Sequence, residues 1–234
     1  MLADEQPGSA VGTFDTDLHL PMTFLNTVLD FIAKQLPFWR DDPIRRRETA
    51  ETRLTGQLCR FLNGAARKSK LDHIDFQTEF PDAVKRSRTI DLSPAPRGCT
   101  IWIGGRQYTP YDALFPIECK RLPTPVARNR ERREYLHTFV KKGGGVQRFR
   151  EGLHGADHSI GAIIGYVQTS TAQSWFAVLN RWIAAFERRA IAGWSHKERL
   201  DNMQHCAVTR TLIASSRHPR SGTPIVLRHI LIEM

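Results

Sequence analysis

Hydrophobic residues recur at helical spacing in three segments of the chain. Between residues 21 and 36 they occupy positions 24, 25, 28, 29, 32 and 36. This pattern predicts an amphipathic helix with Pro21 in its first turn, where a missing amide proton is tolerated. Positions 54, 58, 61, 62 and 65 share one face of a second predicted helix over 43–66. A third is predicted over 172–190, where an apolar stripe that includes Trp175, Trp182 and Phe186 indicates core packing.

Shorter apolar segments predict strands. They cover residues 75–81, 87–94, 99–108, 113–122, 159–169, 205–216 and 224–234. The run over 159–169 is almost entirely apolar, which is typical of a central strand covered on both faces. Between these segments, residues 123–142 predict a basic loop or partly helical insert, and the glycines at 143–145 a turn before a short helix. Strands alternating with helices predict an α/β protein with helices flanking a central sheet.

The N-terminal end of the chain differs from this pattern. Residues 1–20 are polar and predict a flexible or loosely docked arm. We therefore predict an N-terminal arm and helix over 1–42, followed by a single domain over 43–234.

The charge of the chain favours a polyanionic partner. The net charge is +10 over 234 residues, and the isoelectric point is about 9.9. Between residues 120 and 150 there are ten Lys and Arg against two Glu. A basic run of this kind is either a solvated face or a nucleic-acid interface, and the run alone leaves both open.

The cysteines and the apolar segments suggest where the chain resides. Its four cysteines are widely spaced without a CxxC pair, and Cys59 and Cys119 stand among apolar neighbours. This favours reduced core thiols over a zinc site, and hence the cytoplasm. The first twenty residues carry acids but no Lys or Arg, unlike a signal peptide, and no stretch approaches the ~18 apolar residues of a membrane span.

The segment "PIECKRL" places two charges in an apolar strand. Alternation puts Glu118 and Lys120 on one face and Ile117 and Cys119 on the other. Burying an unpaired polar group costs about 2–7 kcal/mol, and a charge costs more. The strand is therefore either an exposed edge or one wall of a site that needs both charges.

A third charged residue in a neighbouring segment favours the site. Asp91, in "RTIDLS", precedes Glu118 by 27 residues, enough for a meander that places the two strands side by side. Asp91, Glu118 and the carbonyl of Cys119 are hard oxygen ligands suited to Mg²⁺, with Mn²⁺ as a substitute. Lys120 would orient or help deprotonate the attacking water and offset transition-state charge. Asp112 is the alternative carboxylate, but it is close to Glu118 for an adjacent antiparallel strand.

Asp91 followed by Glu118-Cys119-Lys120 resembles the signature of the PD-(D/E)XK nuclease superfamily. The segment "ETRLTGQLCRFL" is similar to the first helix of that family, and "GVQRFREGL" followed by "IIGYVQ" resembles its core order over about residues 48–170. Tyr135 with "GGGVQRF" and "GAIIGYV" looks like nucleases found near bacterial restriction and defence genes. The chain departs from the pattern because Thr89-Ile90 precedes Asp91 without a proline and because Pro116 lies in the Glu118 strand.

The resemblance implies a restriction-endonuclease-like mixed sheet with N-terminal and C-terminal additions. It adds Glu51 to the metal and catalytic residues, with Glu48 as its rival. The implied reaction is Mg²⁺-dependent hydrolysis of DNA, with double-stranded DNA as the favoured substrate, to 5′-phosphate and 3′-hydroxyl ends in restriction or anti-phage defence. Candidate phosphate contacts are Arg121, Arg128, Arg130, Arg132, Arg133, Lys141, Lys142 and Arg148.

Two other classes of function share this evidence. One is a catalytically silent nucleic-acid-binding or scaffold subunit, and the other is an RNA-processing nuclease. A homodimer or partner subunits of a defence system fit either class.

Two further motifs are weaker. The glycines at 143–145 lack the GK[ST] of a phosphate loop and favour a turn. His154 and His158 have the spacing of metal ligands, but the intervening Gly155 and the lack of a third histidine nearby favour an ordinary loop.

Overall fold

The computed structural model describes residues 21–82, 88–125, 130–139 and 143–234. It has a mixed seven-stranded sheet with N-terminal helices and a C-terminal helix and strands, which confirms the α/β prediction. The predicted arm over 1–20 lies outside the described residues, as do Arg128, Lys141 and Lys142.

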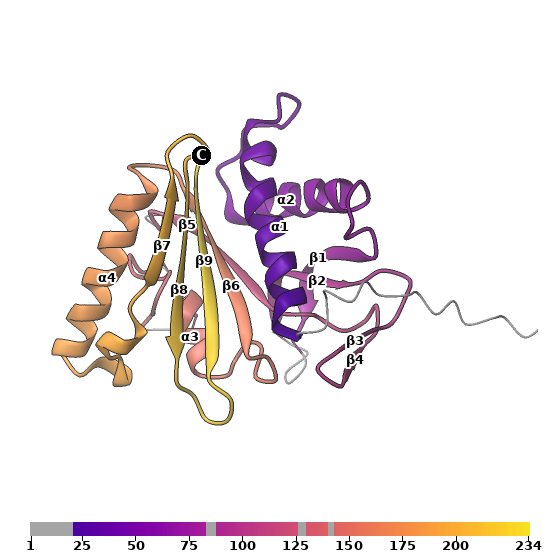
Figure 1. Cartoon of the computed structure of the whole chain (residues 1–234). Coiled ribbons are helices and arrows are strands. Elements are labelled where there is room, and N and C mark those ends of the chain that lie inside the picture. The colour runs from indigo at the N-terminus through magenta and orange to yellow at the C-terminus, as the bar shows by residue number, and fades with distance from the viewer. Residues whose placement is uncertain (1–20, 83–87, 126–129, 140–142) are drawn as a thin grey trace, which may run out of the picture.

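The sheet has a parallel centre and antiparallel sides (Figure 1). Its central strands are β5 (Ile117–Leu122), β6 (Ile160–Val167) and β9 (Ile225–Glu233), which run parallel in that order. On one side β5 continues into β2 (Thr89–Pro96) and β1 (Ile74–Pro81), and on the other β9 continues into β8 (Thr211–His218) and β7 (Asp201–Cys206). Every residue of β6 is buried, as its uninterrupted apolar run predicts.

Helices cover both faces of the sheet. Helices α1 (Pro21–Asp41) and α2 (Glu51–Ala66) pack on one face, where their apolar stripes meet Cys119 of β5 and Tyr166 of β6 in one core cluster. Helices α3 (Gly145–Arg150) and α4 (Ala172–Arg188) lie on the other face, where Leu122 and Ile163 belong to a second cluster. Glu118 and Lys120 of β5 therefore lie on the face that α3 covers.

Two helix boundaries differ from the prediction. Helix α1 continues past Leu36 and through Pro37 to Asp41. Its last turn is held by tertiary contacts, since Trp39 is buried against Tyr166 and the Arg40 guanidinium donates to the Thr209 carbonyl at 2.6 Å. Helix α2 begins at Glu51 instead of Pro43. Residues 43–50 have no apolar stripe to dock as a helix, and hydrogen bonds such as Gln57 to the Arg46 carbonyl hold them instead.

Two strand predictions also need correction. The segment 205–216 is a hairpin, in which β7 ends at Cys206 and β8 begins at Thr211. The segment 99–108 is a separate small hairpin of β3 (Ile101–Ile103) and β4 (Arg106–Tyr108). Pro116 stands directly before β5 and so removes no hydrogen bond from within the strand.

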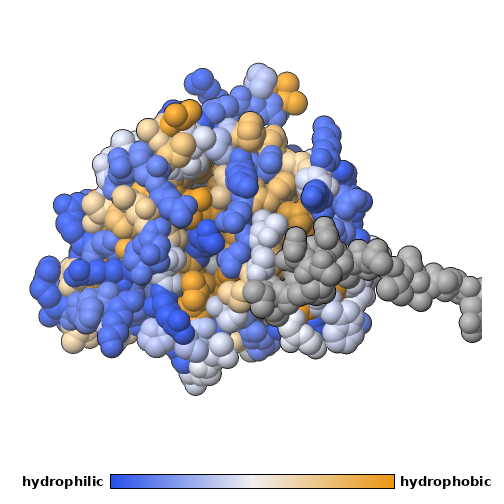
Figure 2. All heavy atoms as spheres, viewed as in Figure 1, coloured by the Kyte–Doolittle hydropathy of each residue, from blue (hydrophilic) through white to orange (hydrophobic). Residues whose placement is uncertain are grey.

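Figure 2 shows that hydrophilic residues cover most of the face seen in Figure 1, with hydrophobic residues in small groups between them. Along the described ranges, no helix combines the length and the apolarity needed to cross a membrane. Cys59 and Cys119 are buried free thiols, as predicted.

Five buried polar side chains form a continuous hydrogen-bonded chain beside the second core cluster. Tyr135 Oη lies 2.9 Å from His229 Nδ1, His229 Nε2 lies 2.7 Å from Ser216 Oγ, Ser216 Oγ lies 2.6 Å from His218 Nε2, and His218 Nδ1 lies 2.9 Å from Glu198 Oε1. A carboxylate only accepts, so His218 donates to Glu198 and accepts from Ser216. Ser216 then accepts from His229, which accepts from Tyr135. Neutral histidines thus satisfy the whole chain in one direction.

Glu198, the last residue of this hydrogen-bonded series, forms an ion pair with a residue of helix α3. Glu198, in a short 3₁₀ turn (His196–Glu198), pairs with the Arg150 guanidinium at 2.5 Å and 3.2 Å. Glu198 is fully buried, so the pair holds the C-terminal strands and α3 in a fixed relation.

We expect the protein to lose stability as the pH falls from 7 to 5. Burial lowers the pKa of His229 to about 3 and also lowers the pKa of His218, whereas unfolded imidazoles titrate near ~6.5. The unfolded state then binds more protons than the native state, and each such histidine decreases the free energy of unfolding by up to about 1.4 kcal/mol per pH unit. Urea unfolding at pH 7, 6 and 5 measures this slope.

Two substitutions test whether the slope comes from the buried chain. His229→Leu should reduce the slope of unfolding free energy against pH by the amount that corresponds to about one proton. His205→Gln, at a partly exposed position on β7, should leave it unchanged. Equal slopes in the wild type and His229→Leu would contradict the assignment.

Candidate active site

Strands β2 and β5 pair and then separate beside Asp91. They pair at Leu92 and Ile117. Asp91 stands one residue before Leu92, and Cys119 stands two residues after Ile117. The Asp91 carboxylate reaches across to β5, and its Oδ2 accepts a hydrogen bond from the Cys119 amide at 2.8 Å. A side chain thus takes the place of a main-chain acceptor, which fixes Asp91 at the point where the sheet opens.

The backbone beside Asp91 is strained. On β1, Thr78 pairs with Leu92 and Phe80 with Ile90, so Glu79 faces Asp91. Glu79 has a φ of 54°, in the left-handed region, where a residue with a Cβ pays roughly 1–2 kcal/mol. Strain of this kind clusters at functional sites and is held in place by the surrounding structure.

The Lys120 ammonium lies at the centre of the site. Its Nζ lies 3.4 Å from Glu51 Oε1, 3.3 Å from Asp91 Oδ2, 3.2 Å from Glu118 Oε2 and 3.0 Å from the Cys119 carbonyl oxygen. These residues supply the four metal-ligand oxygens expected from the sequence. The structure therefore gathers the expected ligands, and it gathers them around one positive charge.

Glu51 reaches this cluster because it is the first residue of α2. Its Oε2 accepts from the Arg121 amide at 2.9 Å, and the Arg130 guanidinium lies 3.2 Å from the same oxygen. A carboxylate in the first turn also interacts favourably with the helix dipole. Glu48, the rival position, lies before the helix and pairs with Arg53 at 3.4 Å.

Glu118 is fully buried and surrounded by positive or donor groups. Besides Lys120, Arg148 Nη1 lies 3.2 Å and 3.1 Å from its two oxygens, and His154 Nδ1 lies 2.6 Å from Oε1. Arg148 was expected to contact phosphate, but it belongs to α3, which packs over β5 and brings the guanidinium onto Glu118.

The charges of the cluster stabilise one another. Burial alone would raise the pKa of Glu118, but Lys120, the His154 hydrogen bond and Arg148 outweigh it and hold that pKa far below its usual range. Burial alone would lower the pKa of Lys120, but Glu118, Asp91 and Glu51 raise it well above its usual value. The glutamate is therefore an anion and the lysine a cation throughout the neutral range.

Asp91 takes up a proton more readily than Glu118. Its burial and the negative charge of Glu118 raise its pKa above the usual value, against the opposing effect of Lys120. Its side chain retains 30% of its exposure, whereas that of Glu118 retains none. Asp91 is thus the member of the pair that a ligand from solvent can reach.

Sequence reasoning missed His154. The histidine was interpreted as part of a loop pair with His158, yet the fold places it against Glu118. No spacing rule signals this contact, since it depends on how the loop after α3 folds back over β5. His158 is unrelated to the cluster, and its Nε2 donates to the Ala113 carbonyl at 3.0 Å.

Most of the described basic candidates make internal contacts. The Arg121 guanidinium donates to Gln168 at 2.8 Å, Arg130 binds Glu134 at 2.8 Å, and Arg133 lies over the Phe186 ring at 5.3 Å. Arg132 is exposed. The basic segment therefore holds residues of the site in position through these contacts, and it also adds positive charge to the surface.

Asp112 and the glycine turn have structural explanations of their own. Asp112 accepts hydrogen bonds from the Thr109 amide and hydroxyl at 2.8 Å and 2.6 Å. Gly144 and Gly145 pack against another segment, because an added Cβ would lie 2.5 Å from His137 Cα and 2.8 Å from the Tyr135 carbonyl oxygen. These glycines are explained by close packing.

The donor set suits a hard divalent cation, but its arrangement is closed around Lys120. Carboxylate and carbonyl oxygens are the ligands that Mg²⁺ prefers. Within the residues that the structure describes, no group of three or more His, Cys, Asp or Glu side chains is placed to hold a metal ion. The ammonium that separates the carboxylates accounts for this.

Comparison of the chain with protein-family models, with curated proteins and with solved structures finds no match.

We expect Glu118→Gln to destabilise the fold strongly. The amide removes the charge that balances Lys120 and Arg148 in a fully buried position, and breaking a buried pair costs up to about 3–5 kcal/mol. The urea-unfolding midpoint measures the loss. Glu48→Gln is the matched control, since its partner Arg53 is 72% exposed, and it should change stability by no more than about 0.5 kcal/mol. Equal midpoints for the two variants would contradict this account of Glu118.

Proposed function

We propose that this protein is a metal-dependent nuclease of the PD-(D/E)XK kind that hydrolyses phosphodiester bonds, with DNA as the favoured substrate. The observation that carries the proposal is the convergence of four oxygens, from Glu51, Asp91, Glu118 and the Cys119 carbonyl, on one cation position. They come from a helix and two diverging strands, and holding ionised groups from separate elements together costs desolvation energy that solvated surface charges do not incur. The net charge of +10 supports a polyanionic substrate.

The same four oxygens are the groups that would hold Mg²⁺ or Mn²⁺. When bound, such an ion polarises a phosphoryl oxygen and makes water more acidic. Asp91 and Glu51 keep part of their side-chain surface in solvent, while Glu118 lies beneath them. A phosphate would therefore approach from the side of Asp91 and Glu51.

Lys120 is suited to an electrostatic role. The surrounding carboxylates raise its pKa, so it remains an ammonium and is a poor proton acceptor at neutral pH. A fixed positive charge at this position stabilises negative charge that develops on a phosphoryl group in the transition state.

A second candidate function is a nucleic-acid-binding subunit without turnover. The observation that favours it is the engagement of both Glu118 oxygens by Lys120, Arg148 and His154. In that case the charge cluster stabilises the fold and a metal never enters.

We expect the wild type to cleave DNA in Mg²⁺ and to be inactive in EDTA. Lys120→Ala should reduce cleavage by on the order of 10²-fold or more, the scale of removing one positioned charge. Asp91→Asn should do the same, while Glu48→Gln should cleave like the wild type. Parallel assays on DNA and RNA identify the substrate. Full cleavage by Lys120→Ala would rule out this site, and DNA binding without any cleavage would favour the second candidate.

Calorimetric titration with Mg²⁺ and Mn²⁺ provides a readout independent of cleavage. The metal and the ammonium compete for the same oxygens, so Lys120→Met should bind the ion more tightly than the wild type. Asp91→Asn should weaken or abolish the binding. If Lys120→Met and Asp91→Asn both bind the ion as the wild type does, the oxygens around Lys120 are not the metal site.

A further inference from the structure

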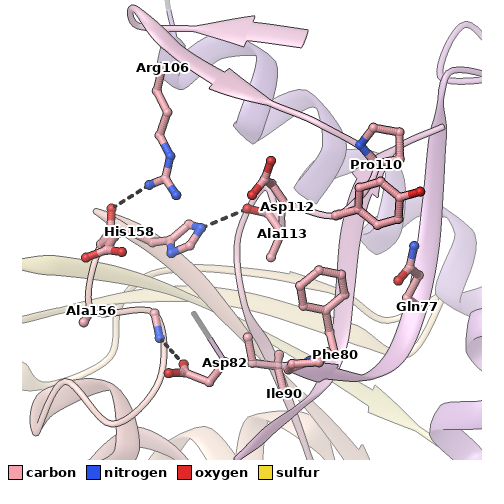
Figure 3. Close-up of a pocket in the computed structure, with 14 residues that line it drawn as sticks. Gln77, Phe80, Asp82, Ile90, Arg106, Pro110, Asp112, Ala113, Ala156 and His158 are labelled. Atoms are coloured by element: carbon pink, nitrogen blue, oxygen red, sulfur yellow. Dashed lines mark hydrogen bonds between the residues drawn. The ribbon is translucent and has the colours of Figure 1, made fainter. Parts of the chain in front are cut away.

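A cavity of about 680 Å³ lies at the edge of the sheet beside the candidate active site. Its walls come from the end of β1, the beginning of β2, the loop 109–113 and the loop 155–158 (Figure 3). The volume falls within the range of about 300–1,000 Å³ that is typical of small-ligand sites. In Figure 3 the Phe80 ring points into the space bounded by Asp112, Pro110 and Gln77.

One short loop belongs to both the cavity and the charge cluster. His154 lies 2.6 Å from Glu118, and the next residue, Gly155, donates its amide to Asp82 on the cavity wall at 3.3 Å. Gly155 has a φ of 59°, and an added Cβ would lie 2.5 Å from the Pro116 ring. The loop is therefore held tightly against the residue that precedes β5, and the cavity adjoins the strand that carries Glu118.

The apolar part of the lining presents aromatic surface. Phe80 is partly exposed, and Tyr111 is 87% exposed, although large aromatic side chains are usually buried. Ile90, the neighbour of Asp91 on β2, and Pro110 complete this wall. Exposed aromatic rings provide platforms on which flat heterocycles stack, with little preference for one base over another.

The polar part of the lining is acidic, in contrast to the chain as a whole. Among the lining residues that the structure describes, Asp82, Asp112 and Asp157 stand against one arginine, Arg106, whose guanidinium already donates to the Asp157 carbonyl at 3.4 Å. Hydrogen bonds from Thr109 lower the pKa of Asp112, and burial lowers the pKa of His158. At neutral pH Asp112 is thus an anion and His158 uncharged. Such a lining repels phosphate and favours a ligand with N–H donors.

We propose that this cavity binds a nucleobase, that is, a flat heterocycle stacked on Phe80 and Tyr111 with its N–H groups toward the aspartates. One source of the base is a nucleotide turned out of a DNA strand that is bound at the Lys120 cluster, and for this source the inference rests on the proposed function. A free nucleoside presents the same chemistry and is the other source.

Calorimetric titration with adenosine, cytidine, guanosine and thymidine, without metal, tests the cavity directly. We expect binding of at least one nucleoside by the wild type, and weaker binding of its 5′-monophosphate because of the acidic lining. Tyr111→Ala should weaken nucleoside binding about tenfold without unfolding the protein, since Tyr111 is exposed. Phe38→Ala is the matched control, because Phe38 is a 66% exposed ring on α1 that lines a different hollow with Pro37 and Val208, and it should bind like the wild type.

A duplex containing 2-aminopurine, mixed with protein in EDTA, tests the second source. The fluorescence of the base should rise when it leaves the stack, and Tyr111→Ala should reduce the rise while Phe38→Ala should not. A positive result in either arm supports the proposal. No nucleoside binding together with no fluorescence change would overturn it, as would equal binding by Tyr111→Ala or tighter binding of the monophosphate. None of these readouts requires cleavage. Cleavage without base binding would leave the nuclease proposal standing and overturn the cavity proposal. Base binding without cleavage would support the cavity proposal and count against the nuclease proposal.

Discussion

Glu118 and Lys120 carry full charges on the face of β5 that helix α3 covers, where burying either ion alone would cost several kcal/mol. Each is tolerated because the other is 3.2 Å away and because further partners complete the balance. Those partners come from elements distant in the sequence: Glu51 from α2, Asp91 from β2 and Arg148 from α3. The start of α2, the opening between β2 and β5 and the position of α3 over β5 are all needed to keep these two charges compensated.

The compensation also determines what the site can do. Lys120 holds its proton strongly and Glu118 stays ionised, so neither acts readily as an acid or a base near neutral pH. What remains is electrostatics: four oxygens that hold one cation, and an ammonium that can either fill that position or stand beside it. The proposed enzyme and the proposed binding subunit differ in which of these two arrangements occurs with substrate bound.

The sequence was most informative where one periodicity decides the answer. Alternation along β5 placed Glu118 with Lys120, and the interval to Asp91 was sufficient to place the next carboxylate on an adjoining strand. Other features depend on contacts that no local pattern encodes. Helix α1 passes Pro37 because Trp39 and Arg40 are anchored in the core, and His154 reaches Glu118 because a loop folds back over the sheet. Arg148 was identified as a basic residue, but its carboxylate partner depends on the packing of α3.

The directed chain from Tyr135 through His229, Ser216 and His218 to Glu198 has a consequence for how this sequence can diverge. Each of the three inner members has one partner ahead and one behind, so replacing Ser216 by alanine would leave one nitrogen on each histidine without a partner. Replacing all the members together by apolar residues leaves nothing stranded. These positions should therefore evolve as a block, in which homologues carry either the complete polar set or an apolar substitute for it, and mixed combinations are rare.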